Sequence, residues 1–292
     1  MSPLIVASAS RQELDAQLSP SRSAKDASGI IQLWGTESEQ ARRSPGIRTV
    51  LDLPYGPAAS QKLDVYTGGA EEGGLRPIFV FIHGGFWQQG SKDNSAFAAP
   101  AFVAANWVYI AAGYTLAPNA TLTSIVAEIR SALRFIRLHA REYGGDPDRI
   151  VVAGHSAGGH LAASLLTDDT GGARAAPCAG IVAISGVFDL APIHASYVND
   201  AVRMTQDEVA TLSPVLHAPA YDVPVVLVVG SEETSEFIRQ TDVLAHAWKP
   251  HLTTLSVETI ADKDHFDIVL GLADPSSRLF RLVTGIPSNA PQ

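Results

Sequence analysis

A serine between two glycines, placed where a strand pattern gives way to a helix pattern, constrains the fold of this chain more than any other feature. Residues 150–153 are apolar and mostly β-branched, and Gly154-His155-Ser156-Ala157-Gly158 follows them directly. Residues 157–166 are then typical of a helix rich in alanine and leucine. Small residues two positions before and after the serine let a strand and a helix approach closely. The sequence therefore predicts a sharp turn that projects the hydroxyl of Ser156 above a sheet, at the N-terminus of a helix whose free amides favour negative charge.

Strand patterns and helix patterns alternate along most of the chain. Such alternation predicts an α/β protein with a mostly parallel central sheet and helices on both faces. The first two strand patterns fit an antiparallel edge, and Gly144-Gly145-Asp146-Pro147 predicts a turn. We expect strands at residues 49–53, 62–66, 78–83, 108–113, 150–153, 179–184, 223–230 and 252–258, and helices at 122–143, 157–166 and 276–283.

Composition divides the chain into three parts. Residues 1–45 are polar and rich in Ala, Ser and Arg, and they predict an N-terminal helical extension packed on the body, with helices near 11–18 and 24–41. Residues 46–285 predict a single domain, since α/β folds of this size often form one. Residues 286–292, rich in Pro, Ala, Ser and Asn, predict a loose C-terminal tail.

Charge and cysteine content exclude several classes of partner and site. The formal net charge is −9, from 30 acidic against 21 basic residues, and no basic cluster exceeds Arg42-Arg43, so we expect no nucleic-acid partner. The single cysteine, Cys178, rules out a disulfide within the chain and a CxxC metal site. No apolar stretch reaches the roughly 18 residues of a membrane span, and residues 4–7 are too short an apolar run for a signal-peptide core. We therefore expect a cytoplasmic protein with no membrane partner.

A glycine-rich loop follows the apolar strand pattern at residues 78–82. It is His83-Gly84-Gly85-Phe86-Trp87, and its glycines let backbone amides turn toward a reacting oxygen. The amides of Gly85 and Phe86, together with that of Ala157 after the serine, are the predicted oxyanion hole.

The side chains around this loop have several interpretations. His83 is interpreted as structural, holding the loop through hydrogen bonds. Phe86 and Trp87 fit either the core or a wall against the substrate, and with His155 they are the side chains expected to contact it.

A serine in such a turn needs a general base, because a free hydroxyl is a weak nucleophile. In the α/β-hydrolase fold, which this turn and loop predict, the acid and then the histidine follow the serine along the chain. His265 lies in a polar loop after the last strand pattern and is the predicted base. Glu232 and Glu233 both follow the strand pattern that ends at Gly230, and either can supply the carboxylate that orients the imidazole.

Several of these motifs resemble those of one family, the kynurenine formamidases (arylformamidases). The similar segments are residues 83–87, His-Gly-Gly-Phe-Trp; residues 154–160, Gly-His-Ser-Ala-Gly-Gly-His; residues 236–240, Glu-Phe-Ile-Arg-Gln; and His265-Phe266. The resemblance covers nearly the whole chain. It implies Glu233 as the acid, since the family's acid lies three residues before the Glu-Phe pair. Many members have Asp there, so Glu233 is a departure from part of the family.

The resemblance implies a serine hydrolase that cleaves an amide or ester of a small, aromatic substrate through an acyl-enzyme. In an arylformamidase the acyl group is formyl and the leaving group is an aryl amine, and no metal or cofactor is needed. A carboxylesterase or another small-molecule amidase would use the same triad, and a non-catalytic binding protein on this scaffold is a third alternative. The oligomeric state is open, with a homodimer as one alternative.

Overall fold

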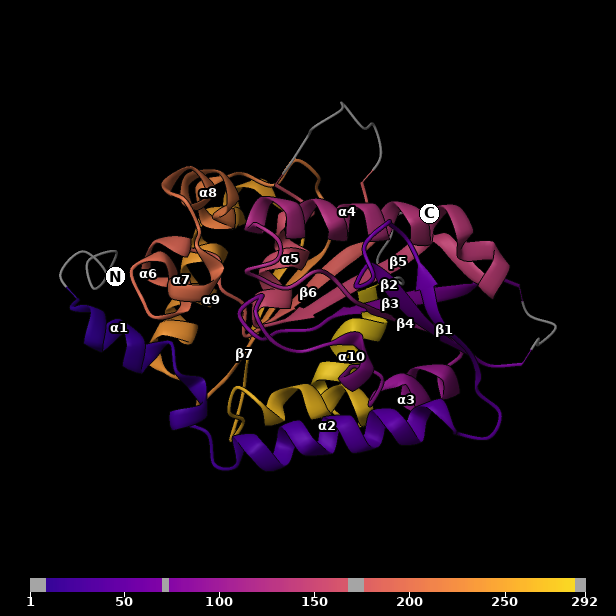
Figure 1. Cartoon of the computed structure of the whole chain (residues 1–292). Helices are drawn as coiled ribbons and strands as arrows, with labels where there is room; N and C mark the ends of the chain where they lie inside the picture. Colours follow the sequence, from indigo (N-terminus) through magenta and orange to yellow (C-terminus); the bar gives the residue numbers. More distant parts are fainter. Residues whose placement is uncertain (1–8, 70–73, 168–175, 287–292) are drawn as a thin grey trace.

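In the computed structural model, residues 9–69, 74–167 and 176–286 are described, and they contain one eight-stranded sheet. Its strand order is β1-β2-β4-β3-β5-β6-β7-β8 (Figure 1). The strands are β1 (Arg48–Pro54), β2 (Lys62–Thr67), β3 (Arg76–Ile82), β4 (Val108–Ala112), β5 (Gly145–His155), β6 (Gly180–Ile184), β7 (Val225–Gly230) and β8 (Leu255–Ile260).

The sheet is parallel from β4 to β8, and its first strands are antiparallel. β1 pairs antiparallel with β2, which confirms the predicted edge, and β2 also runs antiparallel to β4. All other neighbouring pairs are parallel. The carboxyl ends of the parallel strands therefore meet at one edge, where the loops of an α/β sheet place their functional side chains.

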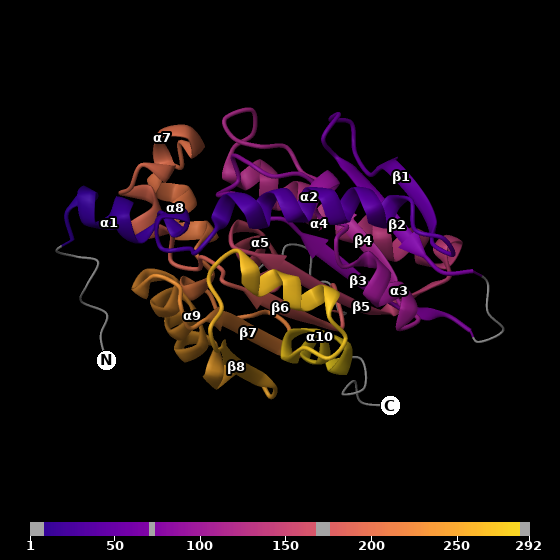
Figure 2. The same ribbon diagram turned by 90° about the horizontal axis from the view of Figure 1, so that it is seen from below.

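Helices cover both faces of the sheet. The side chains of β3 alternate between the faces, since Ile78, Val80 and Ile82 join one buried cluster while Phe79 and Phe81 join the other. α4 and α5 pack on the first face, and α2, α3 and α10 lie over the second (Figures 1 and 2). The helices are α1 (Arg11–Gln17), α2 (Ala27–Arg42), α3 (Ala99–Ala104), α4 (Leu122–His139), α5 (Ala157–Ser164), α6 (Leu190–His194), α7 (Val198–Val202), α8 (Gln206–Leu212), α9 (Ser235–Trp248) and α10 (Arg278–Gly285).

Three local predictions need correction. Of the predicted turn at residues 144–147, only Gly144 (φ 72°) lies in a turn. Gly145 already pairs with Arg76 and belongs to β5. β8 begins at Leu255, three residues after the predicted start at residue 252, and ends at Ile260. Of the predicted loose tail at residues 286–292, Ile286 is buried against the second face, and residues 287–292 lie outside the described residues.

No helix within the described ranges is both long enough and apolar enough to cross a membrane.

Candidate active site

Ser156 occupies a strained turn between β5 and α5. Its backbone has φ 56° and ψ −119°, a conformation that L-residues rarely adopt. The turn closes only with glycine beside it, because a Cβ on Gly154 would lie 1.9 Å from the carbonyl oxygen of Gly158. The strand–turn–helix of the sequence analysis is thus present, and it places Ser156 at the carboxyl edge of the sheet.

His265 and Glu233 form a buried pair at the same edge. The Nδ1 of His265 lies 2.7 Å from Oε2 of Glu233, with both side chains almost fully buried. Glu233 follows β7 and His265 follows β8, while Glu232 is exposed. Nδ1–H donates to the carboxylate, so Nε2 of the neutral ring carries a lone pair that can accept a proton. Within the described chain, no protein atom is hydrogen-bonded to that Nε2.

Two further donors hold the carboxylate of Glu233, and the sequence analysis did not single them out. The hydroxyl of Ser185 donates to Oε1 at 2.5 Å, and the amide of Gly230 donates to the same oxygen at 2.8 Å. Ser185 is fully buried directly after β6, with φ 52°. One sequence signal was its position at the end of a parallel strand that neighbours both β5 and β7.

The glycine-rich loop lies against the serine. A Cβ on Gly84 would come within 2.9 Å of the Cβ of Ser156, so only glycine allows this approach. Gly85 (φ 101°) and Phe86 (φ 47°) both have left-handed backbone conformations. Among the residues the structure describes, the amides of Gly85, Phe86 and Ala157 donate to no protein acceptor. These three amides therefore stay candidates for the oxyanion hole.

Two buried histidines support the site without charge. His155 donates from Nε2 to the carbonyl oxygen of His265 at 2.7 Å. Burial, with a smaller effect from the neighbouring His265, holds the pKa of His155 well below its usual range. His83 stacks on Tyr114 with ring centroids 4.3 Å apart and donates from Nδ1 to the carbonyl of Gly84, while burial lowers its pKa to about 4. His83 therefore has the loop-holding contacts expected of it.

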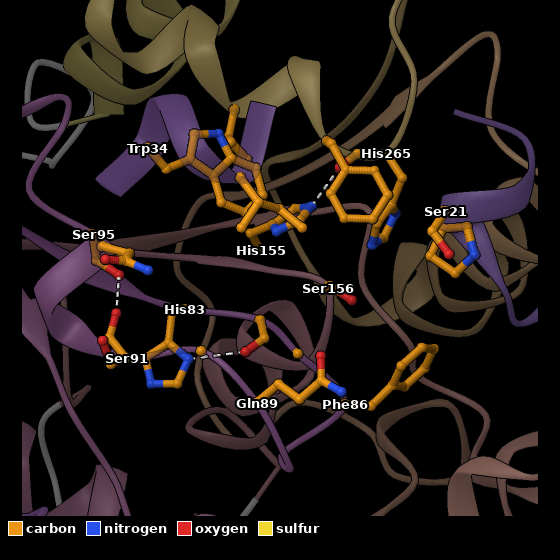
Figure 3. A pocket seen from close by; sticks show the side chains of 18 of the residues that line it. Ser21, Trp34, His83, Phe86, Gln89, Ser91, Ser95, His155, Ser156 and His265 are labelled. Carbon is orange, nitrogen blue, oxygen red and sulfur yellow. Dashed lines mark hydrogen bonds between the residues drawn. The ribbon is translucent and has the colours of Figure 1, made fainter. Parts of the chain in front are cut away.

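A pocket of about 340 Å³ opens over these groups (Figure 3). Ser156, His265, Phe86 and His155 line it. Trp87 does not, and its interpretation as a substrate contact is wrong. Its side chain is fully buried in the core and meets the ring of His160 edge-on at 5.1 Å.

The N-terminal segment completes one side of the pocket, which the sequence did not predict. Ser21 and Trp34, the latter on α2, are part of the lining. Trp34 lies edge-on to His155 at 5.9 Å (Figure 3). The amide of Lys25 donates to the carboxylate of Asp264, the residue before His265, at 3.1 Å. The described ranges contain no group of three or more His, Cys, Asp or Glu placed to hold a metal ion.

Comparison with known proteins agrees with this geometry. A family named BD-FAE matches residues 63–248. Kynurenine formamidase of Danio rerio is 31% identical over 287 residues, which cover 94% of this chain and 96% of that protein. The chain belongs to the kynurenine formamidase family. As a family member it is an enzyme of the α/β-hydrolase type.

Solved structures extend the same relationship. A crystal structure of a candidate thioesterase from Silicibacter sp. is 31% identical, with a TM-score of 0.83 over 93% of this chain and 99% of that one. Esterase B of Lactobacillus rhamnosis superposes with a TM-score of 0.69 over 89% and 96% of the two chains. At 18% identity this second likeness concerns the α/β-hydrolase fold alone.

Proposed function

We propose that Ser156, His265 and Glu233 are a catalytic triad that hydrolyses aryl formamides. The observation that carries the proposal is the buried His265–Glu233 hydrogen bond of 2.7 Å in the same pocket as the strained Ser156. This arrangement provides a nucleophile, a base with a free nitrogen and an acid that fixes the base's tautomer.

In the first step, Ser156 Oγ attacks the formamide carbon and its proton passes to Nε2 of His265. The carbonyl π electrons move to oxygen, where the amides of Gly85, Phe86 and Ala157 stabilise the negative charge. Each such donor lowers the barrier by about 3 kcal/mol. Glu233 stabilises the imidazolium that forms.

In the second step, His265 returns the proton to the nitrogen of the leaving aryl amine. The C–N bond breaks and a formyl ester of Ser156 remains. Water then attacks that ester, again with His265 as base, and releases formate and the free serine. Every step uses groups of this chain and water.

The formamide substrate is supported by the kynurenine formamidase relative, which matches almost end to end, and by the aromatic side chains of the pocket. A carboxylesterase would use the same triad.

We also infer a cytoplasmic location. A homodimer is a further hypothesis, which size-exclusion chromatography with light scattering tests.

The experiment compares wild type and Ser156→Ala on N-formylkynurenine and on p-nitrophenyl acetate. We expect formamide hydrolysis that falls at least about 10³-fold in Ser156→Ala. Hydrolysis of the ester alone would contradict the formamidase proposal and support a carboxylesterase. Activity on neither, with no fluorophosphonate labelling of Ser156, would leave a binding protein on a hydrolase scaffold.

A further inference from the structure

The pocket of Ser156 has no fixed charge in its wall. Within the described ranges, none of the residues that line it is Asp, Glu, Lys or Arg. Its basic side chains are His83, His155 and His265. Burial keeps the first two uncharged at neutral pH, since the pKa of His83 falls to about 4 and that of His155 falls well below its usual range. The third, His265, is the proposed general base.

Three charged residues adjacent in sequence to the wall, Lys92, Asp93 and Asp264, are already engaged elsewhere. The ammonium of Lys92 lies 2.9 Å from the carboxylate of Asp93 and 2.8 Å from that of the buried Asp64. The carboxylate of Asp264 accepts hydrogen bonds from three backbone amides, those of residues 25, 266 and 267. None of these three groups is a free counter-ion for a substrate, and Arg22, which is exposed and follows Ser21, lies outside the lining.

One part of the wall is aromatic. The ring of Trp34 lies 6.3 Å from that of Phe97 and 6.0 Å from that of Phe266, with the planes within about 30° of parallel. His155 closes the group edge-on to Trp34, and Phe266 meets the ring of His265 at 5.4 Å. Flat apolar walls beside the general acid–base suit an aromatic leaving group.

The other part of the wall is polar but neutral. Its hydroxyl and amide groups come from Ser21, Gln89 and Ser91, which Figure 3 labels, and from Asn94. In the described chain, the side-chain amides of Gln89 and Asn94 make no hydrogen bond to another residue. Neutral donors of this kind match a ketone, amide or ester oxygen of a substrate.

We infer that the pocket selects electroneutral aryl substrates, and that an ionised amino-acid head group on the substrate lowers kcat/KM. A carboxylate or ammonium taken into this pocket would lose its hydration without an opposite charge to replace it. The inference rests on the proposed function and defines the substrate class of the same site.

The test is the ratio of kcat/KM for two formamides. N-(2-acetylphenyl)formamide keeps the ring, the formamide and the ortho ketone of N-formylkynurenine and lacks its ammonium and carboxylate. We expect the neutral compound to have at least a threefold higher kcat/KM. Equal values, or a preference for N-formylkynurenine, would overturn the inference.

An ester pair separates this result from a failure of the proposed function. If neither formamide is hydrolysed but esters are, the formamidase proposal fails while the charge inference is still tested by phenyl acetate against 4-acetoxybenzoate. A preference for the neutral ester supports the inference, and no preference overturns it. Activity on none of the four compounds overturns both.

A charged variant makes the same point from the protein side. Gln89→Arg places a cation at the exposed polar wall, and Gln89→Met is its uncharged control of similar length. Relative to the Met variant, Gln89→Arg should raise the N-formylkynurenine to neutral-formamide ratio of kcat/KM about tenfold. An unchanged ratio would contradict the view that the missing counter-ion sets the preference.

Discussion

The hydroxyl of Ser185 lies 2.5 Å from Oε1 of Glu233, so the carboxylate that faces His265 is itself held by the neighbouring strand end. The Gly230 amide donates to the same oxygen at 2.8 Å, which leaves Oε2 for the imidazole. Each oxygen thus has its own donors, and the carboxylate cannot rotate without breaking them. Ser185 is a positioning residue in this arrangement, since it acts on the reaction through Glu233.

Ser185→Ala should lower kcat about 10- to 100-fold while KM stays within about twofold, because a misplaced acid affects proton transfer more than binding. Loss of a hydrogen bond to a charged group should also reduce the free energy of unfolding by about 1.5–3 kcal/mol. Steady-state kinetics and urea denaturation measure the two effects. Ser164→Ala is the control, because Ser164 is equally buried but donates to the carbonyl of His160. An unchanged kcat in Ser185→Ala would contradict the positioning role.

Three buried histidines make the stability of the protein sensitive to mild acid. Burial lowers the pKa of His83 and of His160 to about 4, and that of His155 lies well below its usual range. An unfolded histidine titrates near pH 6.5. Below that pH the unfolded chain binds more protons than the folded one, so stability is complete above about pH 6.5 and is lost as the pH falls toward 4.

Urea denaturation at pH 7.5, 6 and 5 measures this loss. Each of the three histidines should contribute up to about 1.4 kcal/mol per pH unit within the window. His160→Gln keeps a donor for the carbonyl of Leu212 but does not titrate, so it should remove about a third of the slope. Equal free energies of unfolding at pH 7.5 and pH 5 would show that these rings ionise freely in the folded protein.

The sequence predicted the parts of the site that depend on local pattern. The sharp turn at Ser156 and the glycine-rich loop at 83–87 each consist of adjacent residues. Their backbone conformations require glycine at fixed positions, and the spacing of the glycines reveals this. The position of His265 after the last strand followed from chain order. For the acid, local pattern left Glu232 and Glu233 open, and the structure brings Glu233 to the imidazole.

What the sequence could not predict depends on contacts between distant segments. Ser185 meets Glu233 across 48 positions, and no local pattern encodes that pairing. Trp34 reaches the pocket only because α2 packs over the second face of the sheet. Trp87, the last residue of the glycine-rich loop, has φ 58°. Its side chain is buried in the core and does not line the pocket. Motif position alone did not distinguish its direction from that of Phe86.

Lys92 is the counter-ion of a buried carboxylate. Its ammonium lies 2.8 Å from Oδ1 of Asp64, whose side chain is 1% exposed, and 3.0 Å from Oδ1 of Asp52. Lys92→Met leaves the Asp64 charge buried without a partner, which should cost about 3–5 kcal/mol in the free energy of unfolding. Urea denaturation measures the loss.

A double variant tests the cause of that loss. Lys92→Met combined with Asp64→Asn removes both charges and keeps an acceptor for the Asp52 amide, which donates to Asp64 at 2.9 Å. It should recover most of the stability lost in the single variant. If the double variant is no more stable than Lys92→Met, the lost packing of the lysine side chain rather than the unpaired charge explains the effect.

Gly158 sets the distance between α5 and β3, the strand that leads into the glycine-rich loop. A Cβ there would lie 2.1 Å from the carbonyl oxygen of Ile82 and 2.7 Å from that of His83, and neither backbone atom can move alone.

Gly158→Ala should therefore push the start of α5 away from β3 and carry the Ala157 amide away from the loop amides. We expect kcat/KM to fall at least about 100-fold, equivalent to about 2.7 kcal/mol of lost transition-state stabilisation. Gly69→Ala is the control, since a Cβ at Gly69 meets no atom of the described residues within 4 Å. It should stay within about 0.5 kcal/mol of wild type in stability and show unchanged kinetics. Full activity in Gly158→Ala would mean that the separation of α5 and β3 does not determine the geometry of the oxyanion site.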